Sequence, residues 1–354
     1  MKALQIAIVG LKNSGKTTIA EKLKQKKEIE NEKFDIYSFK QGASLIYLSD
    51  TPYNIDEPKE MIAFMKQADA CVFCISAIDS IDQKLGELIL LMNYSNVDKG
   101  IIAITKTDSS TPQDIESLKN KIKAVLTESK IKEASIVETS SITNEGFDEL
   151  KEEIMNIEPK ERKGEKFEMP VECAKEVNRE ITNVFGIINS GKVKKYDKVN
   201  LMPWGKEFIV QELNLHGEIV EEVESGNRVG ISFKGLYPWD VQMGDWISEE
   251  NVFEKGKKLK IELDITNFFK DKLRANSECR LNIGLQTFPV TINKISKDGS
   301  EINEAEPGQK VEVEVESKLP FTFKKDYGCI LLNPEAHWQS IRTVGAGIVK
   351  EALE

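Results

Sequence analysis

The first 156 residues alternate short apolar runs with stretches in which apolar residues recur every three or four positions. Apolar runs of this length predict buried strands, and the three-to-four spacing predicts amphipathic helices. Strands are expected at 4–9, 35–40, 44–49, 70–75 and 100–105, and helices near 16–26, 57–67, 84–94, 112–126 and 145–156. This alternation predicts an α/β fold with a mainly parallel sheet covered by helices, and one edge hairpin formed by the second and third of these strands.

The pattern changes after residue 157. The stretch 158–166 is polar and charged, as is typical of a linker. Beyond it, short runs rich in Val, Ile and Phe recur about every ten residues, divided by Gly, Asn and Asp turns, which predicts all-β barrels. We therefore expect an α/β domain over 1–157 and two β-barrels over 167–250 and 256–354.

Charge and cysteine usage narrow the class of protein. The net charge of -10 argues against a chain-wide basic surface, so any RNA contact has to be local and no DNA partner is expected. No apolar run approaches the roughly 18 residues of a membrane span, and the first strand follows the initial Met directly, so we expect a cytoplasmic protein without membrane contact.

Five scattered cysteines do not indicate a disulfide framework. Cys71 and Cys74 form a C-x-x-C inside an apolar run, where they face opposite ways, and no redox or metal role is expected for them.

The segment from Gly10 to Thr17 reads G-x-x-x-x-G-K-T and lies between the first expected strand and the first helix. In this setting backbone N–H groups surround a polyphosphate, the lysine supplies positive charge and the threonine hydroxyl binds Mg²⁺. The sequence therefore predicts a site for a nucleoside di- or triphosphate. The residues expected to bind it here are Asn13, Ser14, Gly15, Lys16, Thr17 and Thr18.

The ends of later strands carry further candidates. Asp50 ends the strand at 44–49 and is expected to hold Mg²⁺ through water, together with Thr17. Thr105, Lys106 and Asp108 follow the strand at 100–105, where a carboxylate accepts hydrogen bonds from both N1 and N2 of guanine. Adenine has no such pair of donors.

Ser140 and Ser141 follow the next strand and are expected to place a backbone N–H against O6 of guanine. GTP or GDP with Mg²⁺ is therefore the expected ligand. Where guanine-binding proteins carry Asn, this chain has Thr105, and the loss of that amide is expected to untie the loop from the phosphate-binding loop and weaken affinity.

An α/β nucleotide domain followed by two barrels resembles the translational GTPases of the EF-Tu type. The strings at 184–193 and 226–230 resemble the second domain of that family, and those at 283–290 and 342–347 are most similar to the SelB type. The match is to a SelB-like subgroup described in archaea, which has degenerate GTPase motifs. The resemblance implies guanine nucleotide and Mg²⁺ as cofactors, and aminoacyl-tRNA or a related RNA and the ribosome as partners.

Three departures from the family pattern bear on hydrolysis. Tyr53 stands where the family has the glycine that senses the γ-phosphate, and Asn54 stands where it has the catalytic histidine. No threonine lies between Thr18 and Thr51, so the usual switch threonine has no counterpart. Because phosphoryl transfer depends on positioning water and charge, we predict that GTP hydrolysis is impaired or lost, and no residue is named as catalytic.

The family's second domain holds the aminoacylated 3′ end of tRNA, which makes Arg179, Asn214, His216 and Arg228 the candidates for RNA contact. The alternative is a non-enzymatic RNA- or protein-binding module with a vestigial phosphate-binding loop. An ATP-using metabolic enzyme is disfavoured by the tandem barrels and by the lack of a further acid, base or metal cluster. The sequence leaves open which RNA or aminoacyl group is bound, whether the ribosome is visited, and the oligomeric state.

Overall fold

The computed structural model describes residues 2–31, 34–51, 58–79, 82–95, 97–334 and 342–353. The chain forms two compact units, one ending at Lys160 and the other beginning at Glu161, and each is described by itself.

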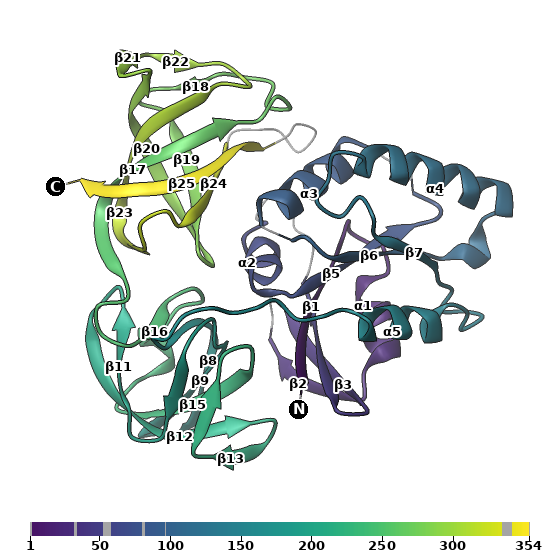
Figure 1. The fold of residues 1–354 in the computed structure, drawn as a ribbon, viewed down its shortest axis with the longest axis horizontal. Helices are drawn as coiled ribbons and strands as arrows, with labels where there is room; N and C mark the ends of the chain where they lie inside the picture. The colour runs from purple at the N-terminus through teal and green to yellow at the C-terminus, as the bar shows by residue number, and fades with distance from the viewer. Residues whose placement is uncertain are drawn as a thin grey trace. The chain divides into compact units, whose positions relative to one another are not determined.

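The first unit is a seven-stranded sheet with the order β2-β3-β4-β1-β5-β6-β7 (Figure 1). Its strands are β1 (Lys2–Gly10), β2 (Lys26–Glu30), β3 (Asp35–Gln41), β4 (Ser44–Asp50), β5 (Ala70–Ser76), β6 (Gly100–Thr105) and β7 (Ser135–Glu138). Its helices are α1 (Lys16–Leu23), α2 (Lys59–Gln67), α3 (Gln83–Tyr94), α4 (Pro112–Leu126) and α5 (Phe147–Met155). The strands β4, β1, β5, β6 and β7 run parallel, whereas β3 is antiparallel to both of its neighbours.

The burial of β5 is that of a central strand in a parallel sheet. All seven residues of β5 are buried, as expected for a central parallel strand covered on both faces. Its cysteines, Cys71 and Cys74, are buried free thiols whose pKa is raised to about 12 by that burial, in keeping with a structural role. The expected mainly parallel sheet and the hairpin of β3 and β4 are confirmed, but β2 and not this hairpin forms the edge of the sheet.

One element differs from the expectation. The predicted helix near 16–26 ends at Leu23, and the chain then enters the strand β2, which pairs antiparallel with β3. The sequence Lys-Lys-Glu-Ile-Glu of β2 consists mainly of good helix formers, but pairing with β3 overrides this weak preference. In the register of the ladder, Glu30 lies opposite Asp35, and Asp35 lies opposite Asp50. The strand therefore ends level with the end of β4.

The second unit begins with a closed barrel. It contains β8 (Glu168–Asn178), β9 (Ile181–Ile187), β10 (Lys192–Lys194), β11 (Lys198–Met202), β12 (Lys206–Leu215), β13 (Glu218–Val220), β14 (Glu222–Glu224), β15 (Arg228–Lys234) and β16 (Trp246–Ser248), with a short 3₁₀ turn, η2 (Pro238–Asp240). The strand order is β11-β16-β8-β9-β15-β12, and pairing of β11 with β12 closes the ring, with β13 added at the outside.

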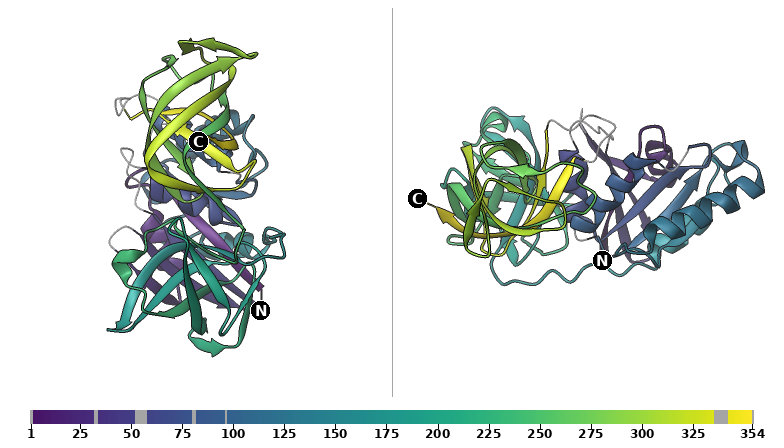
Figure 2. Two further views of the ribbon diagram at one scale, coloured as in Figure 1. Left: turned by 90° about the vertical axis from the view of Figure 1, so that its left-hand side faces the viewer. Right: turned by 90° about the horizontal axis from the view of Figure 1, so that it is seen from above.

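A second closed barrel follows, and its closed course is clearest in Figure 2. It contains β17 (Glu254–Ile265), β18 (Leu273–Arg274), β19 (Glu278–Ile283), β20 (Gln286–Lys297), β21 (Ser300–Ile302), β22 (Glu304–Ala305), β23 (Lys310–Phe323), β24 (Gly328–Leu332) and β25 (Thr343–Leu353). Pairing of β19 with β20 closes the order β19-β24-β25-β17-β23-β20. In β23, Val311, Val313 and Val315 are buried in the barrel core and alternate with half-buried glutamates, the period of two that a strand requires. The predicted α/β domain followed by two barrels is confirmed.

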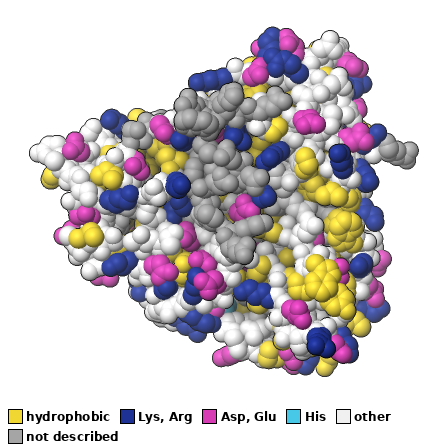
Figure 3. Space-filling model, turned by 180° about the vertical axis from the view of Figure 1, so that it is seen from behind, with side chains coloured by type: hydrophobic (Ala, Val, Ile, Leu, Met, Phe, Trp, Pro, Cys, Tyr) yellow, Lys and Arg dark blue, Asp and Glu magenta, His cyan; other side chains and the backbone are white. Residues whose placement is uncertain are grey.

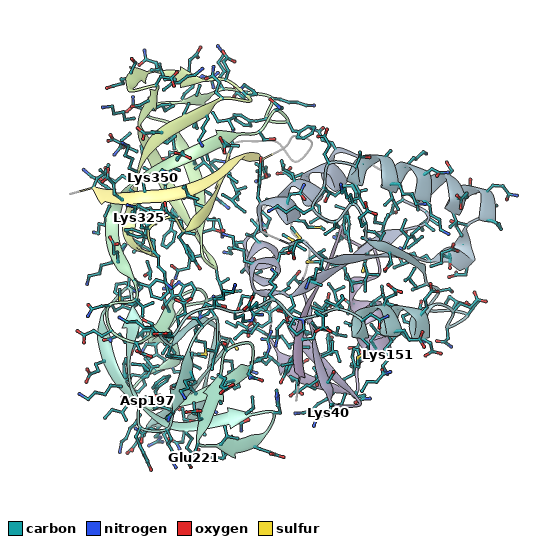
Figure 4. All side chains as sticks on the ribbon, viewed as in Figure 1. Lys40, Lys151, Asp197, Glu221, Lys325 and Lys350 are labelled. Carbon is teal, nitrogen blue, oxygen red and sulfur yellow. The ribbon has the colours of Figure 1, made fainter. Side chains whose placement is uncertain are left out.

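Charged side chains such as Lys40, Glu221 and Lys325 are exposed at the rims of these elements (Figure 4). Figure 3 shows Lys and Arg side chains interspersed with Asp and Glu over the face it presents, rather than gathered into one basic area. Within the described ranges, no helix is both long and apolar enough to cross a membrane.

Candidate nucleotide site

The loop between β1 and α1 has the backbone shape of a phosphate cradle. Asn13 and Gly15 adopt left-handed conformations, with φ of 65° and 87°. At Gly15 a side chain would be strained, and a Cβ would come within 3.1 Å of Thr105. The first N–H groups of α1 lack intrahelical partners by geometry, and they carry the positive end of the helix dipole. The loop therefore curls as the sequence predicts and offers donors suited to a polyphosphate.

Lys16 is held under this loop. Its Nζ donates to the carbonyl oxygen of Leu11 at 2.8 Å, and only 7% of the residue is exposed. Burial lowers the pKa of Lys16, while the nearby Cys74 and Asp50 oppose the shift. Ser14 is also buried, and its Oγ has no hydrogen-bond partner among the described residues. A buried ammonium group and an unsatisfied hydroxyl in the same loop are groups that a bound phosphate would engage.

Thr17 and Asp50 meet as expected for a magnesium site. The Thr17 hydroxyl donates to Asp50 Oδ2 at 2.6 Å. Asp50 is 7% exposed; burial raises its pKa, whereas the Thr17 bond and Lys16 lower it. Its other oxygen, Oδ1, and the hydroxyl of the neighbouring Thr51 are buried without a partner in the described part of the chain.

A hydroxyl and a carboxylate are oxygen donors of the kind that Mg²⁺ prefers, so these residues fit a nucleotide-bound magnesium ion. The described residues contain no group of three or more His, Cys, Asp or Glu side chains able to hold a metal by themselves. Phosphate oxygens and water would therefore complete the coordination, as is usual for Mg²⁺ at nucleotide sites. Thr18, the next residue of α1, is exposed at the same helix start.

Asp108 and Ser140 are brought together from two loops that follow β6 and β7. Ser140 Oγ donates to Asp108 Oδ1 at 2.5 Å, and Ser109 Oγ donates to Oδ2 at 3.0 Å. These bonds lower the pKa of Asp108, because they stabilise the charged carboxylate. Ser109 was not among the sequence candidates, although its position next to Asp108 could have suggested it. A fixed carboxylate with free lone pairs suits the two donors of guanine.

The remaining residues of these loops occupy matching places. Lys106 is in the left-handed conformation, with φ of 59°, directly before the short turn that carries Asp108. Ser141 is half-buried in the turn after Ser140.

Thr105 gives a result that differs from the expectation. Its hydroxyl donates to the backbone oxygen of Ser14 at 2.8 Å, and both residues are at most 4% exposed. The amide of the usual asparagine is absent, but the tie between the guanine-side loop and the phosphate-binding loop is present through the hydroxyl. The expectation that this tie is lost was wrong, because Thr105 lies against Gly15 and its hydroxyl reaches the carbonyl oxygen of Ser14. The weakened affinity stays a prediction.

Tyr53 and Asn54 lie outside the described residues, so the structure says nothing of these two positions.

The RNA candidates of the first barrel are not gathered on one surface. In the ladder Asn214 lies opposite Gly230, whereas Arg179 precedes Ile181, which lies opposite Lys234. Four residues of β15 separate these two levels, roughly 13 Å at the rise of a strand. Asn214 Oδ1 accepts from the N–H of Gly217 at 2.9 Å and so shapes the turn that contains His216.

Arg228 requires a correction. It is 5% exposed and forms an ion pair with Glu172, which is buried in the same barrel. A buried, paired guanidinium cannot also contact RNA from the surface, so Arg228 has a structural role. The sequence could not indicate this, because its partner lies 56 positions away.

Comparison with known proteins finds similarity to translation elongation factors. The family described as "Elongation factor Tu GTP binding domain" matches residues 32–160. The selenocysteine-specific elongation factor of Methanocaldococcus jannaschii is 26% identical over 311 residues, which cover 82% of this chain and 66% of that protein. Elongation factor 1-alpha of Metallosphaera sedula is 27% identical over 226 residues, covering 55% of this chain and 51% of the relative. The chain therefore corresponds to about two thirds and one half of these relatives' lengths.

Among solved structures, translation elongation factor SelB of Methanococcus maripaludis, in complex with the GTP analogue GppNHp, superimposes with a TM-score of 0.87. The match covers 99% of this chain and 79% of that one at 23% sequence identity, and it supports the three-domain fold.

Proposed function

Because the chain is a homologue of the SelB-type translational GTPases, we propose that it is a guanine-nucleotide-binding protein that binds RNA and hydrolyses GTP poorly or not at all. The RNA would be an aminoacyl-tRNA or a related molecule, the partner that the resemblance to translation elongation factors implies.

Nucleotide binding is supported by the way three loops converge. The Thr105 hydroxyl joins the guanine-side loop to Ser14 of the phosphate-binding loop. Thr17 is paired with Asp50, and Asp108 is fixed by Ser140. A vestigial domain has no need to keep these contacts together, since none of them adds to the hydrophobic core of the sheet. Their joint presence favours a working site over a relic.

In the structure, poor hydrolysis is supported by one observation, the strand β2, which adds to the departures at Tyr53 and Asn54. Residues 26–30, which follow α1 directly, are paired in the sheet with β3. In hydrolysing members of this class, switch segments are ordered by the γ-phosphate and Mg²⁺ and are released after hydrolysis. A segment held by ladder hydrogen bonds is not available to close over the phosphate, and it contains no threonine to donate. Most of the catalysis depends on positioning the attacking water, and among the described residues no switch segment following α1 closes over the phosphate to position it.

Titration calorimetry of the nucleotide-free protein with GDP and GppNHp in the presence of Mg²⁺ tests nucleotide binding. Micromolar or tighter binding of both is expected, and Lys16→Ala should abolish it while leaving the barrels folded. Absence of heat from the unaltered protein would favour the alternative, a binding module with a vestigial nucleotide domain. Single-turnover cleavage of GTP, with and without ribosomes, tests hydrolysis. Turnover at the rate of active family members would contradict the proposal for β2.

A further inference from the structure

The loop between β15 and β16 exposes two aromatic rings that lie outside the nucleotide site. Trp239 is 73% exposed and Tyr237 is 42% exposed. Their rings are parallel within 4°, with centroids 4.8 Å apart. Tryptophan is highly buried on average, so a tryptophan with most of its surface in water indicates a contact surface.

The backbone around the rings is fixed in advance. Leu236, which precedes them, is buried, and its carbonyl oxygen accepts from the Thr182 hydroxyl at 2.6 Å. The N–H of Gly235 donates to the carbonyl oxygen of Glu180 at 2.9 Å, which ties the loop to the turn between β8 and β9. Within the loop, the N–H of Asp240 donates to the carbonyl oxygen of Tyr237 at 2.9 Å. Little ordering would therefore be needed when a ligand binds.

A free cation lies in the same turn. Arg179 precedes Glu180, is exposed, and makes no hydrogen bond or ion pair within the described residues. The neighbouring Lys234 is instead engaged by the Glu180 carboxylate at 3.0 Å. The guanidinium group of Arg179 is thus available for an anion, and its planar fork suits phosphate.

We infer that Tyr237, Trp239 and Arg179 form a platform for single-stranded RNA. A nucleobase stacks on the open face of Trp239, and a neighbouring phosphate contacts Arg179. A flat ring face and a guanidinium group, carried by two turns that the Gly235–Glu180 hydrogen bond joins, match the two parts of a nucleotide. A proline-rich peptide instead requires a groove lined by aromatic side chains. This inference rests on the RNA-binding part of the proposed function and adds the surface that carries it. It also places Arg179 in a different surface from Asn214 and His216.

Tryptophan fluorescence of the full chain, titrated with oligo(A) and oligo(U) RNA of about ten nucleotides, tests the platform. Stacking on Trp239 is expected to quench emission, more strongly for oligo(A) because purines offer a larger face. Trp239→Phe should retain binding within about twofold but lose most of the quenching. Trp239→Ala should weaken RNA binding on the order of tenfold. Arg179→Ala should make RNA affinity less dependent on salt concentration.

Trp204→Phe is the matched control, because Trp204 is another exposed tryptophan, at 47%, in the hairpin between β11 and β12. It should leave both affinity and quenching by RNA unchanged. Undiminished RNA affinity in Trp239→Ala, equal quenching by duplex RNA whose base faces are covered, or quenching by a proline-rich peptide instead of RNA would each overturn the platform. If the unaltered protein binds neither oligonucleotide, the platform fails. The RNA-binding part of the proposed function fails only if the protein also does not bind aminoacyl-tRNA, titrated in the same way. Nucleotide binding is measured separately by calorimetry and is not affected by these outcomes.

Discussion

Replacing Thr105 by valine removes one hydroxyl while keeping the shape of the side chain. In the structure this hydroxyl is the donor to the backbone oxygen of Ser14 at 2.8 Å, and both residues are buried. The valine would leave that carbonyl without a donor in a buried place, which costs about 1–3 kcal/mol. If the phosphate-binding loop needs this tie to hold its shape around the nucleotide, the cost corresponds to a loss of roughly 5- to 150-fold in GDP affinity.

Dissociation of a fluorescent GDP derivative, followed by stopped flow, would measure the loss for Thr105→Val, and thermal unfolding would be measured in parallel. Thr182→Val is the matched control, because it removes an equally buried hydroxyl that donates to a carbonyl, at 2.6 Å, in the barrel unit. The control should lose stability without any change in GDP dissociation. GDP affinity within twofold of the unaltered protein in Thr105→Val would refute the role given to this bond. Thr105→Asn separately tests the expectation that threonine weakens affinity, which requires this variant to bind GDP more tightly.

Three further predictions concern charged groups. Asp108→Asn should shift preference from GTP toward xanthosine triphosphate, and unaltered selectivity in a competition assay would contradict the placement of guanine. Asp245 is buried and its pKa is raised to about 6 chiefly by that burial, although it accepts a hydrogen bond from Gln286 Nε2 at 2.8 Å. A raised carboxyl pKa means that the folded state holds the proton more tightly than the unfolded state, so stability is lost as the pH rises from about 4 to 6. Asp245→Asn should therefore stabilise the barrel unit by up to about 3 kcal/mol above pH 6 and by little near pH 4. Urea unfolding at the two pH values measures this difference. Arg228→Ala, which leaves the carboxylate of Glu172 buried and unpaired, should destabilise that unit by about 3–5 kcal/mol, and a drop below 1 kcal/mol would argue against a structural ion pair.

The sequence predicts those parts of the site that depend on local geometry. The loop ending in Lys16 and Thr17 is set by its own glycines and by the strand and helix that flank it, and Asp50 and Asp108 follow from their places at the ends of parallel strands. The barrels follow from the period of two in their strands. These features need no knowledge of distant partners.

Features that depend on distant partners were missed or misread. The strand β2 has a composition that favours a helix, and only its pairing with β3 makes it a strand. Arg228 looks like a surface charge until Glu172 is placed beside it in the barrel. Thr105 in place of asparagine indicates that the tie between the two loops is lost. The structure shows that its hydroxyl instead bonds to Ser14, which lies 91 positions earlier in the chain. In each case the deciding contact is tertiary.

The edge position of β2 also limits what the nucleotide could communicate. A ligand moves a conformational equilibrium only to the extent that it binds one state better than another. A strand that ends level with Asp50 and is held by ladder bonds offers the γ-phosphate no second arrangement on this side of the site to select. Any effect of the nucleotide on the proposed RNA binding would then be the same for a diphosphate and a triphosphate. Such a protein would use its nucleotide as a structural cofactor and not as a switch timed by hydrolysis.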